Sequence, residues 1–367
     1  LMDRQTLLSL PKVELDARIN EAITESITRH TNFRTTSFPE LMKAVESTRL
    51  KTLIESCLEW ERQRPDFTVE AIQTNRAFAG KNINGVQWYD NGNKYSFLKM
   101  DTVIKSLALY SHELKTGEET RLLSTNDLRE ASEDTSFSIQ NYQWSPHSRY
   151  ILFTGVTAAR GVKSSGKFYV YNFLEKKFKL VVESEKTQLN AQFSPDGEKL
   201  GFVRGDNLFV VDIQTGKETQ LTFDGNGIIL NGHFDWVYEE EFSIINAFQW
   251  SPESNKIAYW RLDQSQVPEI QIAKWDSLYF NFIEMRYPKA GAKNSLVQIG
   301  IVDIYTTKTA WVDLGEETDI YVPRINFADN QTVAVQRLNR LQNTLDFLFA
   351  DANTGKTHLV FQETNPA

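Results

Sequence analysis

The sequence predicts an all-β fold made of repeated four-stranded units, preceded by a short α-helical segment. Three observations predict this class. Apolar residues recur at helical spacing only up to about residue 66. Beyond that point the apolar period changes to two, the period of a half-buried strand, and one local pattern returns five times. Aromatic residues, which favour strands, make up 12% of the chain.

The helical segment, residues 1–66, carries two apolar stripes. The first recurs mostly every three or four positions, at Val13, Leu15, Ile19, Ile23 and Ile27. The second follows a capping box, in which Ser37 can accept a hydrogen bond from a first-turn N–H while Glu40 reaches back. Pro65 ends it. The two stripes predict a helical hairpin whose apolar side needs a covering partner.

The repeated pattern after residue 70 is an aromatic residue, a short turn and an alternating strand. Its five copies lie at 87–92, 143–148, 192–197, 249–254 and 326–330. Each copy is followed by a second strand and turn, at 107–117, 168–176, 208–216, 299–307 and 345–355. Thr-Gly pairs in three of these turns supply the positive φ that a tight hairpin needs. The first three steps from one copy to the next are slightly long for the roughly 40–50 residues of a four-stranded blade, and the fourth step carries an insertion. The repeat therefore predicts a partial β-propeller of about five blades.

Composition and charge limit the classes of partner. A net charge of −8 disfavours a nucleic-acid partner, because phosphate binding needs clustered Lys and Arg. Cys57 is the only cysteine, so no disulfide within the chain is expected. No apolar stretch is long enough for a membrane span, and the first residues do not resemble a signal peptide. No cofactor or metal is predicted.

An acidic run at residues 231–242 is the strongest candidate for a site. Glu239, Glu240 and Glu241 are adjacent, and like charges that converge raise each other's pKa. In a partly dry cavity they would attract a cation such as a ligand ammonium. Adjacent residues of a strand point to opposite faces, so residues 238–242 are expected to leave the sheet as a short helix or turn. The alternative is an exposed acidic turn between blades.

Residues 235–241, Asp-Trp-Val-Tyr-Glu-Glu-Glu, resemble the double-glutamate motif of the dipeptidyl peptidase IV branch of the prolyl oligopeptidase family. Further similar stretches flank the motif in the expected order, at 193–197, 202–208, 221–225, 250–252, 267–269 and 287–294. The resemblance covers about residues 68 to 367. That family's propeller has eight blades, so the chain would hold about five of them.

The resemblance implies a role for three residues. Glu240 and Glu241 would bind the free α-amino group of a peptide substrate, so that only two residues reach the scissile bond. Arg160 would hold a substrate backbone carbonyl, and the alternative is an exposed loop arginine. The implied activity is that of a serine exopeptidase releasing N-terminal dipeptides with Pro or Ala second. The implied location is the periplasm or outside the cell.

An apolar insertion at residues 267–286 contains Trp275, Leu278, Tyr279, Phe280, Phe282 and Ile283. A segment this apolar is not expected to lie free in water. In the family an arm here helps to form a dimer, which implies a homodimer. The alternative is an arm folded on its own blade.

The catalytic part of that family has no counterpart in this sequence. The nucleophile would lie in a Gly-x-Ser-x-Gly elbow of a C-terminal α/β-hydrolase domain, and no such elbow occurs here. We therefore expect residues 67–367 to be an incomplete propeller that is inactive alone. The alternative is a non-catalytic propeller that serves as a scaffold for protein or peptide binding.

Residues 1–66 do not resemble the family. Residues 58–69 faintly resemble DNA-repair nucleases but lack their metal-binding acids, so no nuclease activity is expected.

Overall fold

The computed structural model describes residues 83–366, except 133, 155–156, 159–160, 165–166, 185–187 and 276–277, together with the single residues Ala17 and Val69. The chain divides into two compact units, Leu1–Asn82 and Ile83–Ala367. The helical segment predicted over residues 1–66 lies outside the described residues, and the predicted boundary after residue 66 stays a prediction.

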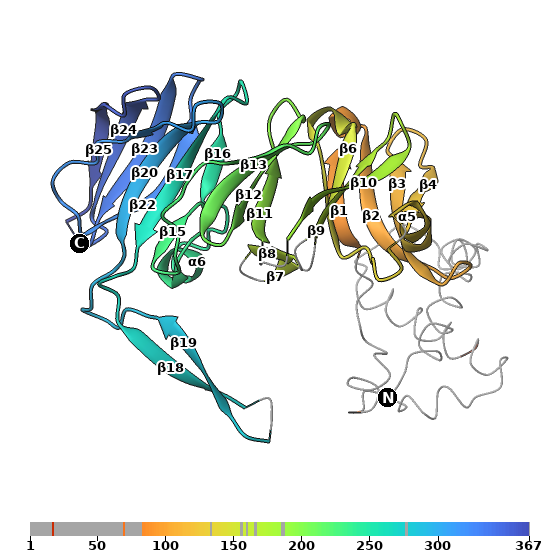
Figure 1. Ribbon diagram of the computed structural model, residues 1–367, viewed down its shortest axis with the longest axis horizontal. Coiled ribbons are helices and arrows are strands. Elements are labelled where there is room, and N and C mark those ends of the chain that lie inside the picture. The colour runs from red at the N-terminus through yellow and green to blue at the C-terminus, as the bar shows by residue number, and fades with distance from the viewer. Residues whose placement is uncertain are drawn as a thin grey trace, which may run out of the picture. The chain divides into compact units, whose positions relative to one another are not determined.

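Within the described residues, the unit Ile83–Ala367 contains five antiparallel sheets of four or more strands, which follow one another in sequence order (Figure 1). The first is β1 (Asn84–Tyr89), β2 (Lys94–Asp101), β3 (Ser106–Glu113) and β4 (Glu119–Ser124), followed by helix α5 (Thr125–Ser132). The second is β5 (Asn141–Trp144), β6 (Tyr150–Thr154), β9 (Lys167–Asn172) and β10 (Lys177–Glu183). These sheets are blades of a partial β-propeller, which confirms the predicted fold class.

The later sheets depart from four simple strands. The third adds the hairpin β7 (Thr157–Ala158) and β8 (Gly161–Ser164) to β11 (Gln188–Phe193), β12 (Lys199–Arg204), β13 (Asn207–Asp212) and β14 (Glu218–Gln220). The fourth contains β15 (Ile229–Asn231), β16 (Phe248–Trp250), β17 (Lys256–Asp263), β20 (Leu296–Asp303) and β21 (Thr309–Trp311). The fifth is β22 (Ile320–Phe327), β23 (Thr332–Asn339), β24 (Thr344–Asp351) and β25 (Thr357–Thr364).

The turns that follow the third strand of each blade share one backbone conformation. In the third, fourth and fifth sheets an aspartate carboxylate accepts the backbone N–H three residues on, at 2.7 Å for Asp212, 2.8 Å for Asp303 and 2.8 Å for Asp351. The predicted glycines here have positive φ, namely Gly117, Gly216 and Gly355. Lys176 and Thr307 take the same position with φ of 53° and 57°.

Apolar clusters fill the space between neighbouring sheets. One joins the second and third sheets through residues such as Phe168 and Phe202, whose rings meet edge to face at 5.5 Å. Another joins the fourth and fifth sheets around Trp260 and Val322. Hydrogen bonds between turns add to this, because the N–H of Asp90 donates to Ser148 Oγ and that of Asp196 to Ser254 Oγ, both at 3.0 Å. Packing and turn contacts together fix each blade against the next.

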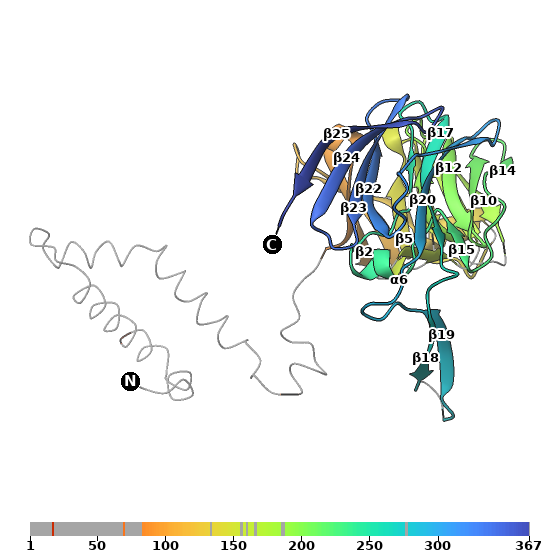
Figure 2. The same cartoon turned by 90° about the vertical axis from the view of Figure 1, so that its left-hand side faces the viewer.

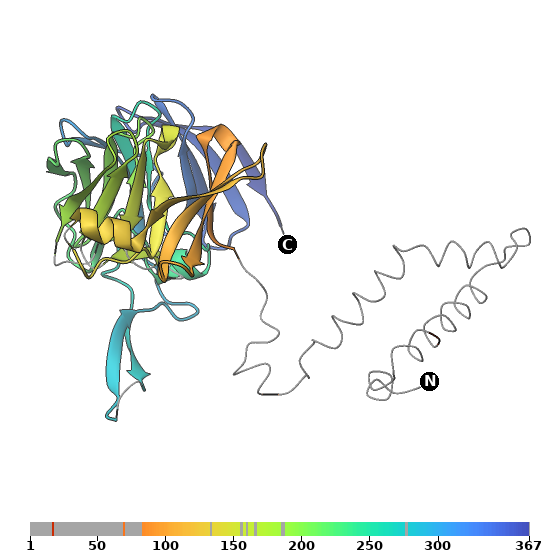
Figure 3. The same cartoon turned by 90° about the vertical axis from the view of Figure 1, so that its right-hand side faces the viewer.

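The predicted insertion forms a separate hairpin. Strand β18 (Glu269–Lys274) pairs with β19 (Asn281–Arg286), and neither pairs with another strand among the described residues. Figures 2 and 3 show that it extends away from the five sheets. Its tip is strongly exposed, with Trp275 at 77% and Leu278 at 92% of their maximal accessibility. The alternative of an arm folded on its own blade is therefore wrong.

Candidate functional site

The acidic motif lies where a strand of the fourth sheet is interrupted. Strands β15 and β16 pair with the same side of β17, with Asn231 opposite Arg261 and Phe248 opposite Tyr259. Trp260 lies between these two pairings. Its carbonyl accepts from Gly232 N and its N–H donates to Ala247 O, both at 3.0 Å. Residues 232–247 therefore leave the sheet and return to it at one residue of β17.

Within this excursion the chain forms the short helix α6 (Trp236–Glu240), as predicted for residues 238–242. Asp235 caps its N-terminus, because the side chain accepts from Tyr238 N at 3.1 Å. The other carboxylate oxygen of Asp235 accepts a hydrogen bond from the buried Ser295 hydroxyl. Burial raises the pKa of Asp235 above its ordinary value.

Helix α6 is tied to the neighbouring fifth sheet through Val322. The Val322 N–H donates to the Tyr238 hydroxyl at 3.0 Å, and its carbonyl accepts from Trp260 Nε1 at 2.8 Å. Strand β22 has an irregular register here, between Tyr321 and Arg324. Side chains therefore form hydrogen bonds with the backbone groups that make none within the sheet. Tyr238 also stacks on Phe234 at 5.2 Å. The helix is thus fixed by packing and by polar contacts.

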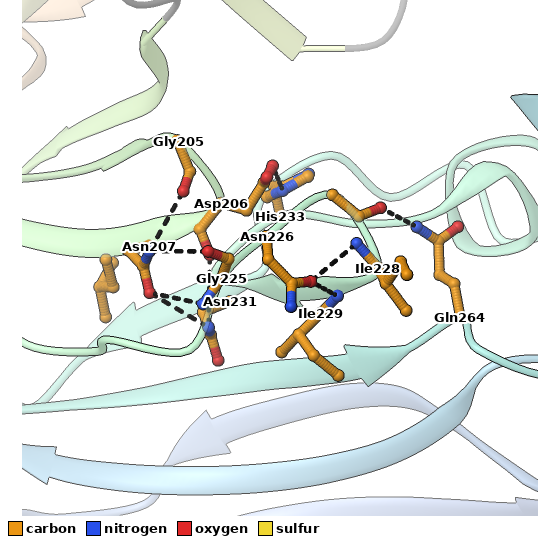
Figure 4. Close-up of polar contacts among 12 residues, drawn as sticks. Gly205, Asp206, Asn207, Gly225, Asn226, Ile228, Ile229, Asn231, His233 and Gln264 are labelled. Atoms are coloured by element: carbon orange, nitrogen blue, oxygen red, sulfur yellow. Dashed lines mark hydrogen bonds and ion pairs between the residues drawn. The ribbon is translucent and has the colours of Figure 1, made fainter. Parts of the chain in front are cut away.

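A hydrogen-bond network, shown in Figure 4, holds the chain that leads into α6. Asn231 Nδ2 donates to Asp224 at 2.9 Å, and Asn231 N donates to the carbonyl of Asp206 at 3.1 Å. His233 Nε2 lies 3.0 Å from the Asp206 carboxylate, and this contact lowers the pKa of Asp206. Asp206 itself lies in the tight turn between β12 and β13. The network therefore joins the third sheet to the start of the excursion.

A second set of contacts orders the turn before β15, also visible in Figure 4. Asn207 Oδ1 accepts from Gly225 N at 3.0 Å and from Thr222 Oγ1 at 3.1 Å. A Cβ at Gly225 would lie only 2.1 Å from the Asp206 carbonyl, so this close approach requires glycine. The loop 222–227 is consequently packed on the β12–β13 turn.

The predicted glutamates end the helix. Glu240 is its last residue and Glu241 its C-terminal cap. Both side chains are exposed, whereas Glu239 is half-buried. Successive helical positions are rotated by about 100°, so the two neighbouring carboxylates are not forced onto opposite faces as in a strand. Arg160, the third predicted site residue, lies outside the described residues.

A cavity of about 330 Å³ begins directly after the motif. Ser243 and Ile244 line one side of it, and Trp260, Pro323 and Arg324 line the other. It therefore lies between the end of the excursion and β22.

Within the residues that the structure describes, no group of three or more His, Cys, Asp or Glu side chains could hold a metal ion. None of the described helices is long and apolar enough to cross a membrane.

Residues 145–367 match the family model described as the dipeptidyl peptidase IV N-terminal region. The chain belongs to this family. A crystal structure of Porphyromonas gingivalis dipeptidyl peptidase 4 superposes with a TM-score of 0.71 at 30% identity, covering 82% of this chain and 42% of that one. The recognition made from residues 235–241 and the flanking stretches is confirmed.

Two curated members of the dipeptidyl peptidase IV family show how much of the protein is represented. Human prolyl endopeptidase FAP is 28% identical over 324 residues, which is 83% of this chain and 41% of the relative. Bovine dipeptidyl peptidase 4 is 30% identical over 240 residues, or 60% of this chain and 31% of the relative. The chain thus spans less than half the length of these relatives.

Several residues that build this candidate site were not identified from the sequence. Ser295 and Val322 contact the α6 segment from far along the chain, and nothing local in the sequence indicates such pairings. Asn231 and His233 lie within the run 231–242 that the sequence singled out, but no role could be assigned to either of them. Their partners across the sheets require the folded structure.

Proposed function

We propose that the chain is the substrate-gating part of a serine exopeptidase that releases N-terminal dipeptides with Pro or Ala at the second position. Its membership of the dipeptidyl peptidase IV family supports this proposal. The single observation that carries it is the placement of Glu240 and Glu241 at the exposed end of an anchored helix, outside the sheet.

In this proposal Glu240 and Glu241 bind the free α-ammonium of the peptide. An ammonium held by two carboxylates makes charge-assisted hydrogen bonds, which are stronger than neutral ones. Anchoring of α6 through Tyr238 supports the role, because a fixed acceptor pair loses less entropy on binding. Arg160 is proposed to hold a backbone carbonyl of the same peptide. The cavity beginning at Ser243 offers space beside the motif.

The chemistry is proposed to come from a C-terminal hydrolase domain, since residues 1–367 contain no Gly-x-Ser-x-Gly elbow. The β18–β19 hairpin is proposed to support a homodimer, because its apolar tip is exposed. We further propose that residues 1–66 form a helical region distinct from the propeller of residues 67–367.

The ammonium site is tested by peptide binding to the full chain. The tripeptide Ala-Pro-Ala should bind, and its N-acetylated form should not. Replacing either acid, Glu240→Gln or Glu241→Gln, should weaken binding about ten- to a hundredfold, because each removes a charge-assisted hydrogen bond. Isothermal titration calorimetry measures this, with Glu316→Gln as an exposed control. Equal binding of the acetylated peptide, with no effect of either variant, would favour the scaffold function instead.

The second test is hydrolysis. The purified chain is expected to release no chromophore from Gly-Pro p-nitroanilide, since its serines lack the expected elbow. Release that survives purification and is blocked by a serine-directed inhibitor would contradict this expectation.

A further inference from the structure

A second cavity, away from α6, lies between the second and third sheets. Its volume is about 460 Å³, within the range of small-molecule sites. Tyr150 and Val170 of the second sheet and Ile213 of the third form an apolar floor, and all three are buried. We call it the cationic cavity because of the side chains on its rim, which are Arg149, Lys176, Lys177 and Lys179.

Positive charge exceeds negative charge around this cavity. Glu175 is the only carboxylate among its described lining residues, and it pairs with Lys177 at 3.3 Å. Arg149 pairs with Glu198 of the next sheet at 3.2 Å. Lys179 has a different environment, because its ammonium donates to the carbonyls of Ile213 and Gln214 at 3.1 and 2.8 Å. Neutral carbonyls fix this ammonium in place without cancelling its charge.

The turn that contributes Lys176 differs from three of its four counterparts, and only Thr307 is a second non-glycine residue at this position. Three of the five equivalent turns have glycine at the position with positive φ, whereas here a lysine has φ of 53°. A non-glycine residue in this conformation costs about 1–2 kcal/mol. Arg149 adds a second unusual feature, since its Nε is buried with no hydrogen-bond partner among the described residues. Its guanidinium lies over the Tyr150 ring at 4.9 Å, which holds it at the cavity wall.

We propose that the cationic cavity binds a small organic anion, a phosphate or carboxylate attached to an aromatic or aliphatic body. The anionic group would meet Lys176, Lys179 and Arg149, where its charge relieves the repulsion between the cations. The body would pack on Tyr150, Val170 and Ile213. This site is independent of the proposed peptide site, because the two share no described residue.

The test is binding of 4-fluorophenyl phosphate to the full chain, followed by ¹⁹F NMR. The neutral 4-fluorobenzyl alcohol, observed directly, and inorganic phosphate, observed through its displacement of the aryl phosphate, separate the contributions of the ring and of the charge. The aryl phosphate is expected to bind saturably and inorganic phosphate at least about tenfold more weakly, while the alcohol shows no saturable binding.

Two variants remove single charges. Lys179→Met should weaken aryl phosphate binding about tenfold or more, since it deletes a charged donor. Lys176→Gly deletes a charge and suits the positive φ, so folding is preserved while affinity falls. Lys217→Met, in the equivalent turn of the third sheet, is the matched control and should bind as the unaltered chain does. Absence of saturable binding at millimolar probe, equal binding of the alcohol, or unchanged affinity in both cavity variants overturns the proposal.

Discussion

At the scale of single residues, two aspartates of the α6 region respond to their surroundings in opposite ways. Asp235 is 7% exposed, and its burial raises its pKa above the ordinary value of 3.8. Asp206 contacts His233, and this contact lowers its pKa below the same value. Burial therefore disfavours the charged form of Asp235. The contact with His233 favours the charged form of Asp206.

Asp235 is expected to tolerate asparagine but not alanine. Asp235→Ala removes the helix cap and leaves the Ser295 hydroxyl without its acceptor, which should lower the free energy of unfolding by about 1–2 kcal/mol. Asp235→Asn keeps an oxygen acceptor and removes a buried charge. The raised pKa means that this charge destabilises the folded state once the pH is well above 3.8. At neutral pH the asparagine variant should thus be at least as stable as the unaltered chain.

Urea unfolding followed by tryptophan fluorescence measures both variants, and any gain from Asp235→Asn should shrink as the pH approaches 3.8. A large loss of stability in the asparagine variant at neutral pH would count against this account of the cap.

Asp206→Asn is expected to show the reverse pH dependence. Because the folded-state pKa is lowered, the carboxylate stabilises the fold above pH 3.8, and this stabilisation is lost as the pH falls through the lowered pKa. The variant should therefore be less stable than the unaltered chain at pH 6 and equal to it in strong acid. Unfolding curves at several pH values test this, with Glu316→Gln as the exposed control. A stability difference independent of pH would contradict the explanation that the contact with His233 stabilises the charged form of Asp206.

At the scale of elements, local chemistry decided what could be predicted. The strands and turns of the blades follow from period-two patterns and Thr-Gly pairs, so they were predicted closely. A short helix or turn was expected over residues 238–242, because Glu240 and Glu241 would point to opposite faces of a strand, and the structure has α6 at Trp236–Glu240. The split into β15 and β16 was missed, because each is only three residues long and both pair with the distant β17. The hairpin β7–β8 was missed because its strands have only two and four residues.

The equivalent turns offer a matched pair of glycines. Gly216 and Gly355 have φ of 73° and 74°, so alanine is strained at both. A Cβ at Gly216 meets nothing within 4 Å, but one at Gly355 would lie 1.8 Å from the carbonyl of Trp311 in the neighbouring sheet. Gly216→Ala should cost about 1–2 kcal/mol, and Gly355→Ala clearly more. Thermal unfolding compares the stability of the two variants. Equal losses of stability would show that the backbone at Trp311 can move away from the added Cβ at little cost.

At the scale of the whole molecule, the hairpin tip and the last strand of the fifth sheet each carry a group of exposed apolar residues. Leu359, Val360 and Phe361 of β25 are each about half exposed, and Trp275 and Leu278 are more so. Scattered apolar residues are ordinary on a surface, but contiguous ones favour association. Among the described residues of this dipeptidyl peptidase IV family chain, the hairpin tip and β25 therefore offer surfaces suited to contact with other protein.

We expect the chain to self-associate at micromolar concentration, with the hairpin contributing. The double variant Trp275→Ser and Leu278→Ser should lower the association state or weaken it at least about tenfold, since it removes large apolar side chains from the contact. Leu174→Ser, at a residue 76% exposed elsewhere, is the control. Sedimentation velocity measures the effect. If the unaltered chain is a monomer, or if all three proteins associate equally, the hairpin does not contribute to self-association.

The return of residues 232–247 to a single residue of β17 has a consequence for how such proteins diversify. Because both ends of the excursion bond to Trp260, the pairing of β15 and β16 does not depend on how many residues lie between them. The entropy of closing a loop grows only slowly with its length. Insertions, deletions or grafted segments at this point can thus change the shape and charge of the surface while the sheet keeps its register.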